Sequence, residues 1–185
     1  MRVISGIAKG RKLIEPKGHK IKPTSDRVKE SVFTIVQFDI EGRAVLDLFA
    51  GSGQYGIEAL SRGARFAKFV DSSKEAVKLI TQNLNICGFS DNAAVYGRDV
   101  LRYLENDEKF DLIFIDPPYD SKLADEAITK IVEFDKLNIN GIIITELGAE
   151  KNPPVVEIPY TLQKEYNYGG VKIIKYTRGT GKKDC

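Results

Sequence analysis

The sequence is poor in the residues that build disulfide and metal frameworks. Its 185 residues include two cysteines, one histidine and no tryptophan. Cys87 and Cys185 cannot make a disulfide framework, and with a single histidine they do not predict a structural zinc site. We therefore expect a protein of a reducing cytoplasm whose chemistry requires no metal.

Long apolar runs are missing as well. No run approaches the roughly 20 residues of a membrane span, and the charged N-terminus lacks the apolar core of a signal peptide. The apolar fraction of 42% and the charged fraction of 29% are ordinary for a globular protein. We expect no membrane contact, a cytoplasmic location and a monomer built mainly from one domain.

The charge is unevenly distributed along the chain. The net charge is only +2, but residues 1–30 contain nine lysines and arginines against three acidic residues, a surplus of six. The remainder is therefore negative, by four charges. This asymmetry is typical of an arm that binds a polyanion, although a merely solvated basic terminus would look the same.

Residues 1–38 are predicted to form an extension of the main domain. The short β-prone pieces Arg2–Ile4 and Lys12–Ile14 enclose two glycines, which favours a small hairpin. A helix should begin near Thr24-Ser25-Asp26, where side chains can cap its free N–H groups. Apolar spacing predicts its inward face, made of Val28, Ser31, Val32, Ile35 and Val36.

From residue 44 onward, buried strands alternate with helices. Strands are expected at 44–49, 66–70, 93–96, 110–115 and 142–145, with helices around 57–60, 74–87, 100–104 and 123–134. Residues 161–166 and 171–176 flank Asn167-Tyr168-Gly169-Gly170 and predict an antiparallel hairpin. The alternation predicts right-handed βαβ units in a doubly wound α/β domain over residues 39–178, followed by a flexible tail at 179–185.

A glycine-rich turn follows the first of these strands. Gly51, Gly53 and Gly56 form a G-x-G-x-x-G pattern between a strand and a helix, which favours close approach of a ligand to the backbone. Asp71 ends the second strand, 20 residues after Gly51, where a carboxylate can bind ribose hydroxyls. Tight packing alone would explain the glycines but not Asp71, so we predict a nucleoside cofactor.

Asp47, at the end of the first strand, helps to decide which cofactor. A dinucleotide would place two phosphate charges near this carboxylate, which is unfavourable. S-adenosylmethionine suits it better, because its ammonium and sulfonium groups favour a nearby anion. Asp99, after the third strand, can accept a hydrogen bond from an adenine amino group or can cap the helix that begins at residue 100.

The fourth strand ends in Asp116-Pro117-Pro118-Tyr119. Neither proline can extend a sheet ladder, so the segment is a rigid tip that carries a carboxylate, a carbonyl and an aromatic ring. The carboxyl end of a strand is where open α/β sheets bind ligands. The plain alternative is a strand-ending turn with a surface tyrosine.

These motifs together resemble a known family. Asp47–Gly53, Asp71, Arg98-Asp99 and Asp116–Tyr119 look like the motifs of class I S-adenosylmethionine-dependent methyltransferases that act on exocyclic amines. The resemblance narrows to bacterial 16S ribosomal RNA guanine-N2 methyltransferases of the RsmD type through four further segments, which are Arg2–Gly6, Lys9–Arg11, Pro23–Glu30 and Ala59–Ala64. Lys22 and Asp71 stand where Arg and Glu are expected, and both keep the charge.

The resemblance covers nearly the whole chain and implies a fold and an activity. The fold would be a Rossmann-like sheet of seven strands in the order 3-2-1-4-5-7-6, with the last strand antiparallel. The activity would be methyl transfer from S-adenosylmethionine, with S-adenosylhomocysteine as product, to the N2 amine of a guanine in 16S ribosomal RNA or the small ribosomal subunit.

The expected site residues fall into three groups. Those for the cofactor are Asp47, Phe49, Ala50, Gly51, Ser52, Gly53, Gly56, Asp71, Arg98, Asp99 and Asp116. The catalytic ones are Asp116, Pro117 and Tyr119, and the RNA-binding ones are Lys9, Arg11, Lys12, Lys22 and Arg27. Tyr166 and Tyr168 either line the pocket rim or are ordinary hairpin aromatics.

Other functions stay open at this point. An adenine-N6 DNA methyltransferase could use the same tip, although the chain has no added recognition domain. Glutamine methylation of a protein is similar chemistry, but it usually has Asn at the first position of the tip. An NAD-linked oxidoreductase would explain the glycines and Asp71 but would leave Asp116–Tyr119 without a role. A non-catalytic RNA-binding module would explain only the basic arm.

Overall fold

The computed structural model describes residues 1–16, 26–118 and 122–181. Its helices are α1 (Asp26–Ile35), α2 (Gln54–Ser61), α3 (Lys74–Cys87), α4 (Val100–Tyr103) and α5 (Leu123–Glu133). Its strands are β1 (Ala44–Leu48), β2 (Phe66–Asp71), β3 (Ala93–Gly97), β4 (Phe110–Ile115), β5 (Leu137–Gly148), β6 (Tyr160–Tyr168) and β7 (Val171–Arg178). No helix in these ranges is long and apolar enough to cross a membrane.

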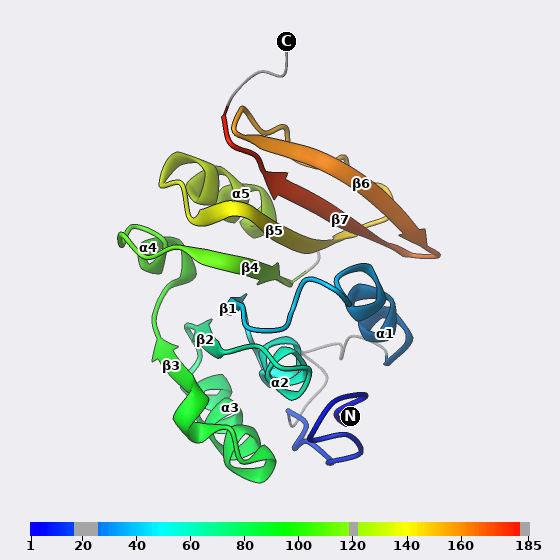
Figure 1. Ribbon diagram of the computed structural model, residues 1–185, viewed down its shortest axis with the longest axis vertical. Coiled ribbons are helices and arrows are strands. Elements are labelled where there is room, and N and C mark those ends of the chain that lie inside the picture. The colour runs from blue at the N-terminus through cyan, green and yellow to red at the C-terminus, as the bar shows by residue number, and fades with distance from the viewer. Residues whose placement is uncertain (17–25, 119–121, 182–185) are drawn as a thin grey trace.

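The strands form one sheet in the order β3-β2-β1-β4-β5-β7-β6, which confirms the predicted Rossmann-like class I fold. In Figure 1 the sheet runs from β3 at the bottom to β6 at the top. The first five strands are parallel, whereas β7 is antiparallel to both β5 and β6. The carboxyl ends of the parallel strands therefore meet at one edge of the sheet.

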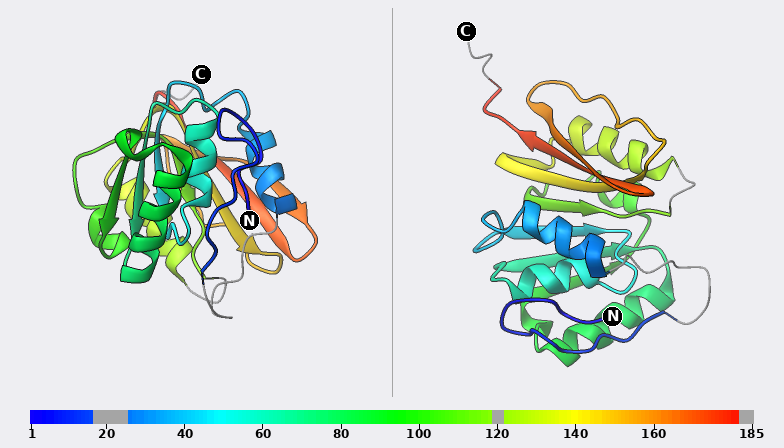
Figure 2. Two further views of the ribbon diagram at one scale, coloured as in Figure 1. Left: turned by 90° about the horizontal axis from the view of Figure 1, so that it is seen from below. Right: turned by 90° about the vertical axis from the view of Figure 1, so that its right-hand side faces the viewer.

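Helices cover both faces of the sheet, as the two views of Figure 2 show. One apolar cluster joins α1, α2 and α3 to the sheet, and a second joins α4 and α5 to its other face. In β1, Val45 belongs to the first cluster and Leu46 to the second. Because the central strands are buried on both faces, they appear in the sequence as continuous apolar runs.

Local sequence explains where the middle helices begin and end. The Ser73 hydroxyl accepts a hydrogen bond from the Ala76 N–H at 3.3 Å and caps α3, and Gly88 ends that helix with φ at 76°. Asp99 caps α4 in the same way, accepting from the Arg102 N–H at 3.0 Å. These caps explain why the predicted limits of both helices lie close to the observed ones.

The predicted limits of two strands were wrong. β5 starts earlier and ends later than the predicted 142–145. Its first residue, Leu137, pairs with Phe110 of β4 before a shift in register, and its last residues pair with β7. β1 stops at Leu48, since Phe49 has a φ of 57° and leaves the sheet. The predicted small N-terminal hairpin is confirmed, and its two pieces are joined by a single antiparallel bridge between Arg2 and Lys12.

The inward face of α1 matches the prediction only in part. The predicted Val32 and Val36 are buried and Val28 and Ile35 pack partly against the same cluster, but Lys29 and Phe33 are buried as well. The spacing is still helical, but a lysine occupies one of the core positions. Its ammonium group donates to the Arg2 carbonyl at 2.6 Å and lies 3.8 Å from a Glu58 carboxylate oxygen, so the buried charge is compensated.

Candidate functional site

Asp47 lies at the centre of the sheet edge where the parallel strands end. Its side chain is only 1% exposed, and its Oδ2 accepts a hydrogen bond from the Gly56 N–H of α2 at 2.9 Å. Burial raises the pKa of Asp47 well above its usual range, the nearby charges of Asp116 and Asp71 raise it further, and the Gly56 hydrogen bond lowers it. A cation placed here would stabilise the ionised carboxylate.

The glycines of the turn differ in how much space surrounds them. A side-chain Cβ at Gly56 would lie 2.3 Å from the Phe69 ring, so this glycine permits close packing of α2 on β2. Gly51 has a φ of 54°, and a Cβ there would meet no atom nearer than the Phe49 carbonyl oxygen at 3.9 Å. The space beside Gly51 is thus not filled by other protein atoms, which leaves room for the ligand that the sequence pattern predicts.

Asp71 fixes this turn from the neighbouring strand. Its Oδ2 accepts from the Gly51 N–H and its Oδ1 from the Ser73 N–H, both at 2.9 Å. Each carboxylate oxygen has a further lone pair that can accept from a hydroxyl group. Asp71 is therefore held in place at the end of β2, where a ribose would be bound.

The predicted residues after β3 lie next to Asp71. The Arg98 N–H donates to the Asp71 carbonyl oxygen at 3.1 Å, and both Arg98 and Asp99 are exposed. The Asp99 side chain caps α4, which is one of the two roles that the sequence predicts for it. Capping occupies one of its carboxylate oxygens, so a role in adenine binding is compatible with it.

Gln54, the first residue of α2, was missed in the sequence. Its side-chain oxygen is buried and has no hydrogen-bond partner among the described residues. This acceptor directly follows Gly53, within the turn that Asp47 supports. An unsatisfied acceptor and a buried carboxylate together fit the cationic amino-acid end of S-adenosylmethionine, so the residues present fit the predicted cofactor.

The Asp116 tip follows β4 at the same edge. Asp116 is half-buried, Pro117 is buried and Pro118 is exposed, while Tyr119 lies outside the described residues. The charge of Asp116 contributes to the raised pKa of Asp47, which places the two carboxyl groups within electrostatic reach of each other. The glycine turn and the tip therefore lie beside each other at one edge of the sheet, because Leu48 and Ile115, which precede them, are register partners.

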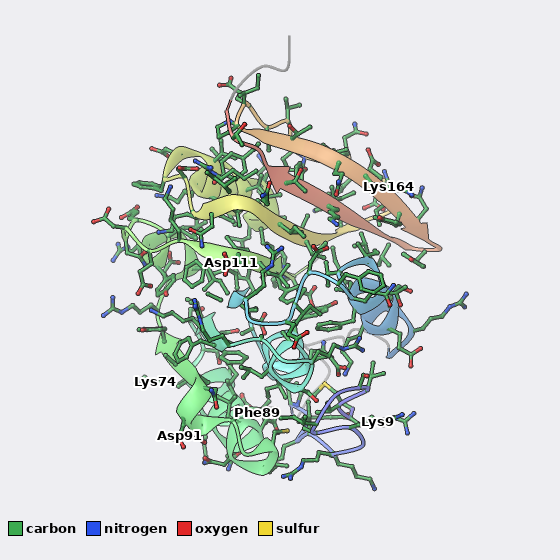
Figure 3. All side chains as sticks on the ribbon, in the orientation of Figure 1. Lys9, Lys74, Phe89, Asp91, Asp111 and Lys164 are labelled. Carbon is green, nitrogen blue, oxygen red and sulfur yellow. The ribbon has the colours of Figure 1, made fainter. Side chains whose placement is uncertain are left out.

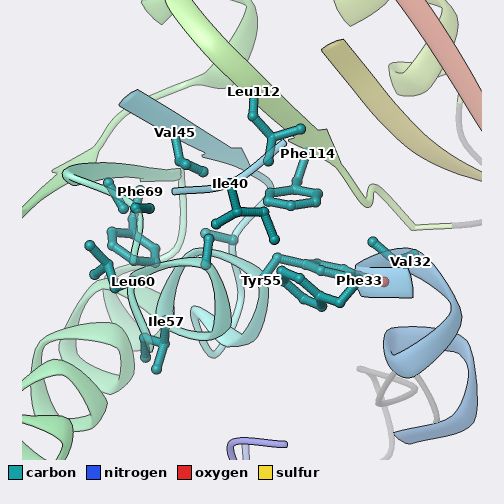
Figure 4. Packing of buried hydrophobic residues seen from close by; sticks show 14 of the residues in the cluster. Val32, Phe33, Ile40, Val45, Tyr55, Ile57, Leu60, Phe69, Leu112 and Phe114 are labelled. Atoms are coloured by element: carbon teal, nitrogen blue, oxygen red, sulfur yellow. The ribbon is translucent and has the colours of Figure 1, made fainter. Parts of the chain in front are cut away.

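An aromatic cluster that the sequence did not reveal supports this site. Tyr55 of α2 stacks on Phe114 of β4 with ring centroids 5.2 Å apart, and Phe33 of α1 packs against both rings (Figure 4). The Tyr55 hydroxyl donates to the carboxylate of Glu146, which is 3% exposed in β5. The sequence signal for Glu146 is a charge two positions after Ile144, the last residue of the apolar run of that strand.

The N-terminal arm, defined here as residues 1–16, docks on α2 through buried polar groups. Glu58 accepts from the N–H groups of Ile4 at 2.7 Å and Ser5 at 2.9 Å. The Ser61 hydroxyl accepts from the Ala8 N–H at 3.0 Å and donates to the Ser5 carbonyl at 2.5 Å. These contacts join two of the segments that carry the family resemblance, Arg2–Gly6 and Ala59–Ala64.

Asn83 of α3 connects the arm to the cofactor turn. Its amide oxygen accepts from the Ile14 N–H at 2.7 Å. Its amide nitrogen donates to the carbonyls of Ile14 at 3.1 Å and Ser52 at 2.9 Å. Asn83 is fully buried, so both segments share one rigid support.

The arm presents most of the predicted basic residues to solvent. Lys9, Arg11, Lys12 and Arg27 are exposed, and Figure 3 shows Lys9 pointing away from the body of the protein. Lys22 lies outside the described residues. Lys29, which contributed to the charge surplus of this region, is buried and does not belong to the basic surface.

Two further features complete the description of the site. Tyr166 and Tyr168 of β6 are half-buried and pack against the apolar cluster on the α1 side of the sheet. Within the described ranges, no three His, Cys, Asp or Glu side chains gather as metal ligands.

Comparison with known proteins now identifies the family. Residues 1–177 match the family model described as conserved hypothetical protein 95. The chain belongs to this family. Ribosomal RNA small subunit methyltransferase D of Haemophilus influenzae is 36% identical over 181 residues, which cover 95% of this chain and 93% of the relative. This relative confirms the resemblance to the RsmD type.

Two other relatives agree in sequence and in structure. YlbH of Bacillus subtilis, provisionally named an rRNA methyltransferase, is 40% identical over 95% of this chain and 98% of its own length. The solved structure of YhhF from Escherichia coli, provisionally described as a methyltransferase, superposes with a TM-score of 0.87 and 32% identity. That match covers 97% of this chain and 98% of the other.

Proposed function

We propose that this protein transfers a methyl group from S-adenosylmethionine to the exocyclic N2 amine of a guanine in 16S ribosomal RNA of the small ribosomal subunit. The observation that carries the proposal is the buried Asp47 under an open glycine turn, with Asp116 beside it at the same sheet edge. The names of the family relatives support ribosomal RNA as the substrate.

The chain supplies a binding group for each part of the cofactor. Asp47 and Gln54 would face its cationic amino-acid end, and the positive end of the α2 dipole would face its carboxylate. Asp71 would accept from the ribose hydroxyls, with Asp99 near the adenine. When bound, S-adenosylmethionine supplies an electrophilic methyl group on its sulfonium centre.

Asp116 and Pro117 would orient the amine that is methylated. The lone pair of a guanine amine is delocalised into the ring, so the amine is a poor nucleophile. If its two N–H groups donate to the Asp116 carboxylate and the Pro117 carbonyl, the nitrogen can become pyramidal and direct its lone pair away from the ring. The rigid prolines hold both acceptors in place, and developing positive charge on the nitrogen is stabilised.

Tyr119 and the basic arm would bind the RNA around this amine. Stacking of Tyr119 on the extruded base would contribute about 1–3 kcal/mol. Lys9, Arg11, Lys12, Lys22 and Arg27 would contact phosphates, so affinity should fall as salt rises. Docking of the arm on α2 and α3 would keep most of these charges in a fixed position relative to the site.

Replacing Asp116 tests the proposal. Asp116→Ala should abolish methyl transfer to small subunits from cells that lack this protein, while calorimetry should find that S-adenosylhomocysteine still binds, with a loss of affinity far smaller than the loss of turnover. Asp91→Ala is the matched control. Asp91 is an exposed aspartate just before the start of β3, whereas the proposed site lies at the carboxyl ends of the strands. Turnover near that of the wild type in Asp116→Ala would refute the assignment.

Two further measurements separate the proposal from its alternatives. Mapping the nucleotide that loses its methyl group in cells without the protein would identify the target base. A methylated adenine in DNA, or binding of NAD in place of S-adenosylmethionine, would exclude the proposed reaction.

A further inference from the structure

Glu146 occupies the position next to Asp116 at the end of the neighbouring strand. β4 and β5 pair in parallel, and the last paired residues are Ile115 and Thr145. Asp116 and Glu146 directly follow this pair, one on each strand. Adjacent strands are about 4.8 Å apart, so the two residues start from neighbouring points of the backbone.

The two carboxyl groups also belong to the same face of the sheet. Phe114 of β4 and Ile144 of β5 are register partners in the apolar cluster on the α1 and α2 side. Side chains two residues further along a strand return to the same face, which places Asp116 and Glu146 there. The Tyr55 hydroxyl reaches Glu146 from α2 and shows that its side chain lies on this face.

Glu146 also lies on the side of the tip away from the cofactor turn. The turn is built on β1 and β2, whereas β5 is on the opposite side of β4. A base whose amine is held at Asp116 and Pro117 enters beside β4, so its ring would extend toward β5. Glu146 is the carboxylate that β5 contributes at this level.

The chemistry of the purine edge gives this carboxylate a role. In guanine the ring nitrogen N1, next to the amine-bearing carbon, has a hydrogen to donate, whereas in adenine N1 has a lone pair. An ionised carboxylate only accepts hydrogen bonds, so it attracts the first and repels the second. The Asp116 tip alone serves either purine amine and cannot make this distinction.

We propose that Glu146 accepts the N1–H of the target guanine and so selects guanine over adenine. The proposal rests on the function proposed above and names the group that determines base specificity. The Tyr55 hydroxyl donates to Glu146 Oε1 and would orient the carboxylate that accepts from the base. Tyr55 would thus be a positioning residue for Glu146.

A base analogue isolates this contact. 2-Aminopurine keeps the amine of guanine but has a lone pair at N1, so Glu146 would repel it. Small subunits reconstituted with RNA that carries guanine or 2-aminopurine at the mapped position would be methylated by the wild type and by Glu146→Gln. We expect the wild type to prefer guanine by about 100-fold or more, since sites built around a hydrogen bond strongly reject analogues that lack it.

The Gln variant should reduce this preference at least tenfold. With its amide oxygen held by Tyr55, its N–H₂ group can donate to N1 of 2-aminopurine, so activity on the analogue rises while activity on guanine falls. Gln82→Ala is the control, because Gln82 is exposed on α3 and should keep the wild-type ratio. A residue with only a structural role would reduce activity on both RNAs equally.

The outcomes distinguish this inference from the proposed function. If the wild type methylates guanine and Glu146→Gln keeps the wild-type ratio, the role of Glu146 is wrong and the proposed function stands. If the wild type methylates neither RNA, both proposals fail. Should Glu146→Gln not fold, as judged by its affinity for S-adenosylhomocysteine, Tyr55→Phe takes its place. It should narrow the preference for guanine, and an unchanged ratio would overturn the proposal.

Discussion

Two glycines of the N-terminal arm offer a test of how firmly the arm is docked. Gly6 and Gly10 have nearly the same backbone conformation, with φ at 81° and 83°. A Cβ at Gly6 would lie 1.7 Å from the Ser61 carbonyl oxygen, whereas a Cβ at Gly10 would have no atom within 4 Å. Both Gly6→Ala and Gly10→Ala therefore place alanine in the left-handed backbone region, but only Gly6→Ala also creates a steric clash.

The magnitudes follow from these contacts. Alanine in the left-handed region costs about 1–2 kcal/mol, which is all that we expect for Gly10→Ala. The clash in Gly6→Ala must also push the arm away from α2. This movement breaks the hydrogen bonds of Ser61 with Ser5, Ile7 and Ala8. At about 1 kcal/mol for each of three bonds, the total for Gly6→Ala should reach about 4–5 kcal/mol.

Urea unfolding of the two variants measures the difference, and hydrogen exchange at the Ile7 and Ala8 amides shows whether the arm has moved. Exchange at these amides should accelerate in Gly6→Ala and stay slow in Gly10→Ala. Equal losses of stability with equal protection of both amides would refute the docking argument. Affinity for S-adenosylhomocysteine serves as the control for an intact cofactor site.

Three further changes probe the charges. Replacing Lys9, Arg11 and Lys12 together with Ala should make the negative slope of log RNA affinity against log salt less steep by about 2 and leave cofactor affinity unchanged. An unchanged slope would show that these three residues do not contact RNA phosphates. Asp47→Asn should raise the urea midpoint of the cofactor-free protein, because burial disfavours the charge, yet weaken S-adenosylhomocysteine binding about tenfold or more in calorimetry. Asp135, whose pKa is held well below its usual range chiefly by hydrogen bonding to Arg178, stabilises the protein above the unfolded pKa near 3.9 and loses this effect as pH falls further. Asp135→Asn should therefore cost about 1 kcal/mol at pH 7 and progressively less in urea unfolding below about pH 4; a deficit independent of pH would contradict this.

The sheet could be predicted from the sequence because its physical signals are local. β4 is a short apolar run that two prolines end, and α3 begins at a serine and ends at a glycine. The strand order came from the family resemblance, since periodicity alone does not specify which strands are neighbours. The glycine turn and Asp71 were found because their spacing is set by a single βαβ unit.

The polar supports of the site could not be predicted in this way. Lys29, Glu58 and Asn83 occupy inward positions that an amphipathic pattern assigns to apolar residues. Their partners are far away in the sequence, as with Asn83 and Ile14, 69 residues apart. Glu146 was missed for the same reason, because its relation to Asp116 depends on the register of two strands. The roles of such residues can be identified only from the three-dimensional structure.

The docking of the arm also bears on the order in which the protein is assembled during synthesis. Residues 1–16 leave the ribosome before Glu58, Ser61 and Asn83, which hold them in the folded protein, are translated. The chain is synthesised at about 5–20 residues per second, so several seconds would pass before α2 and α3 are present to bind the basic segment. During that interval the cationic segment is not yet docked and lies close to the RNA of the translating ribosome. Folding of α2 and α3 would then bind it to the rest of the protein.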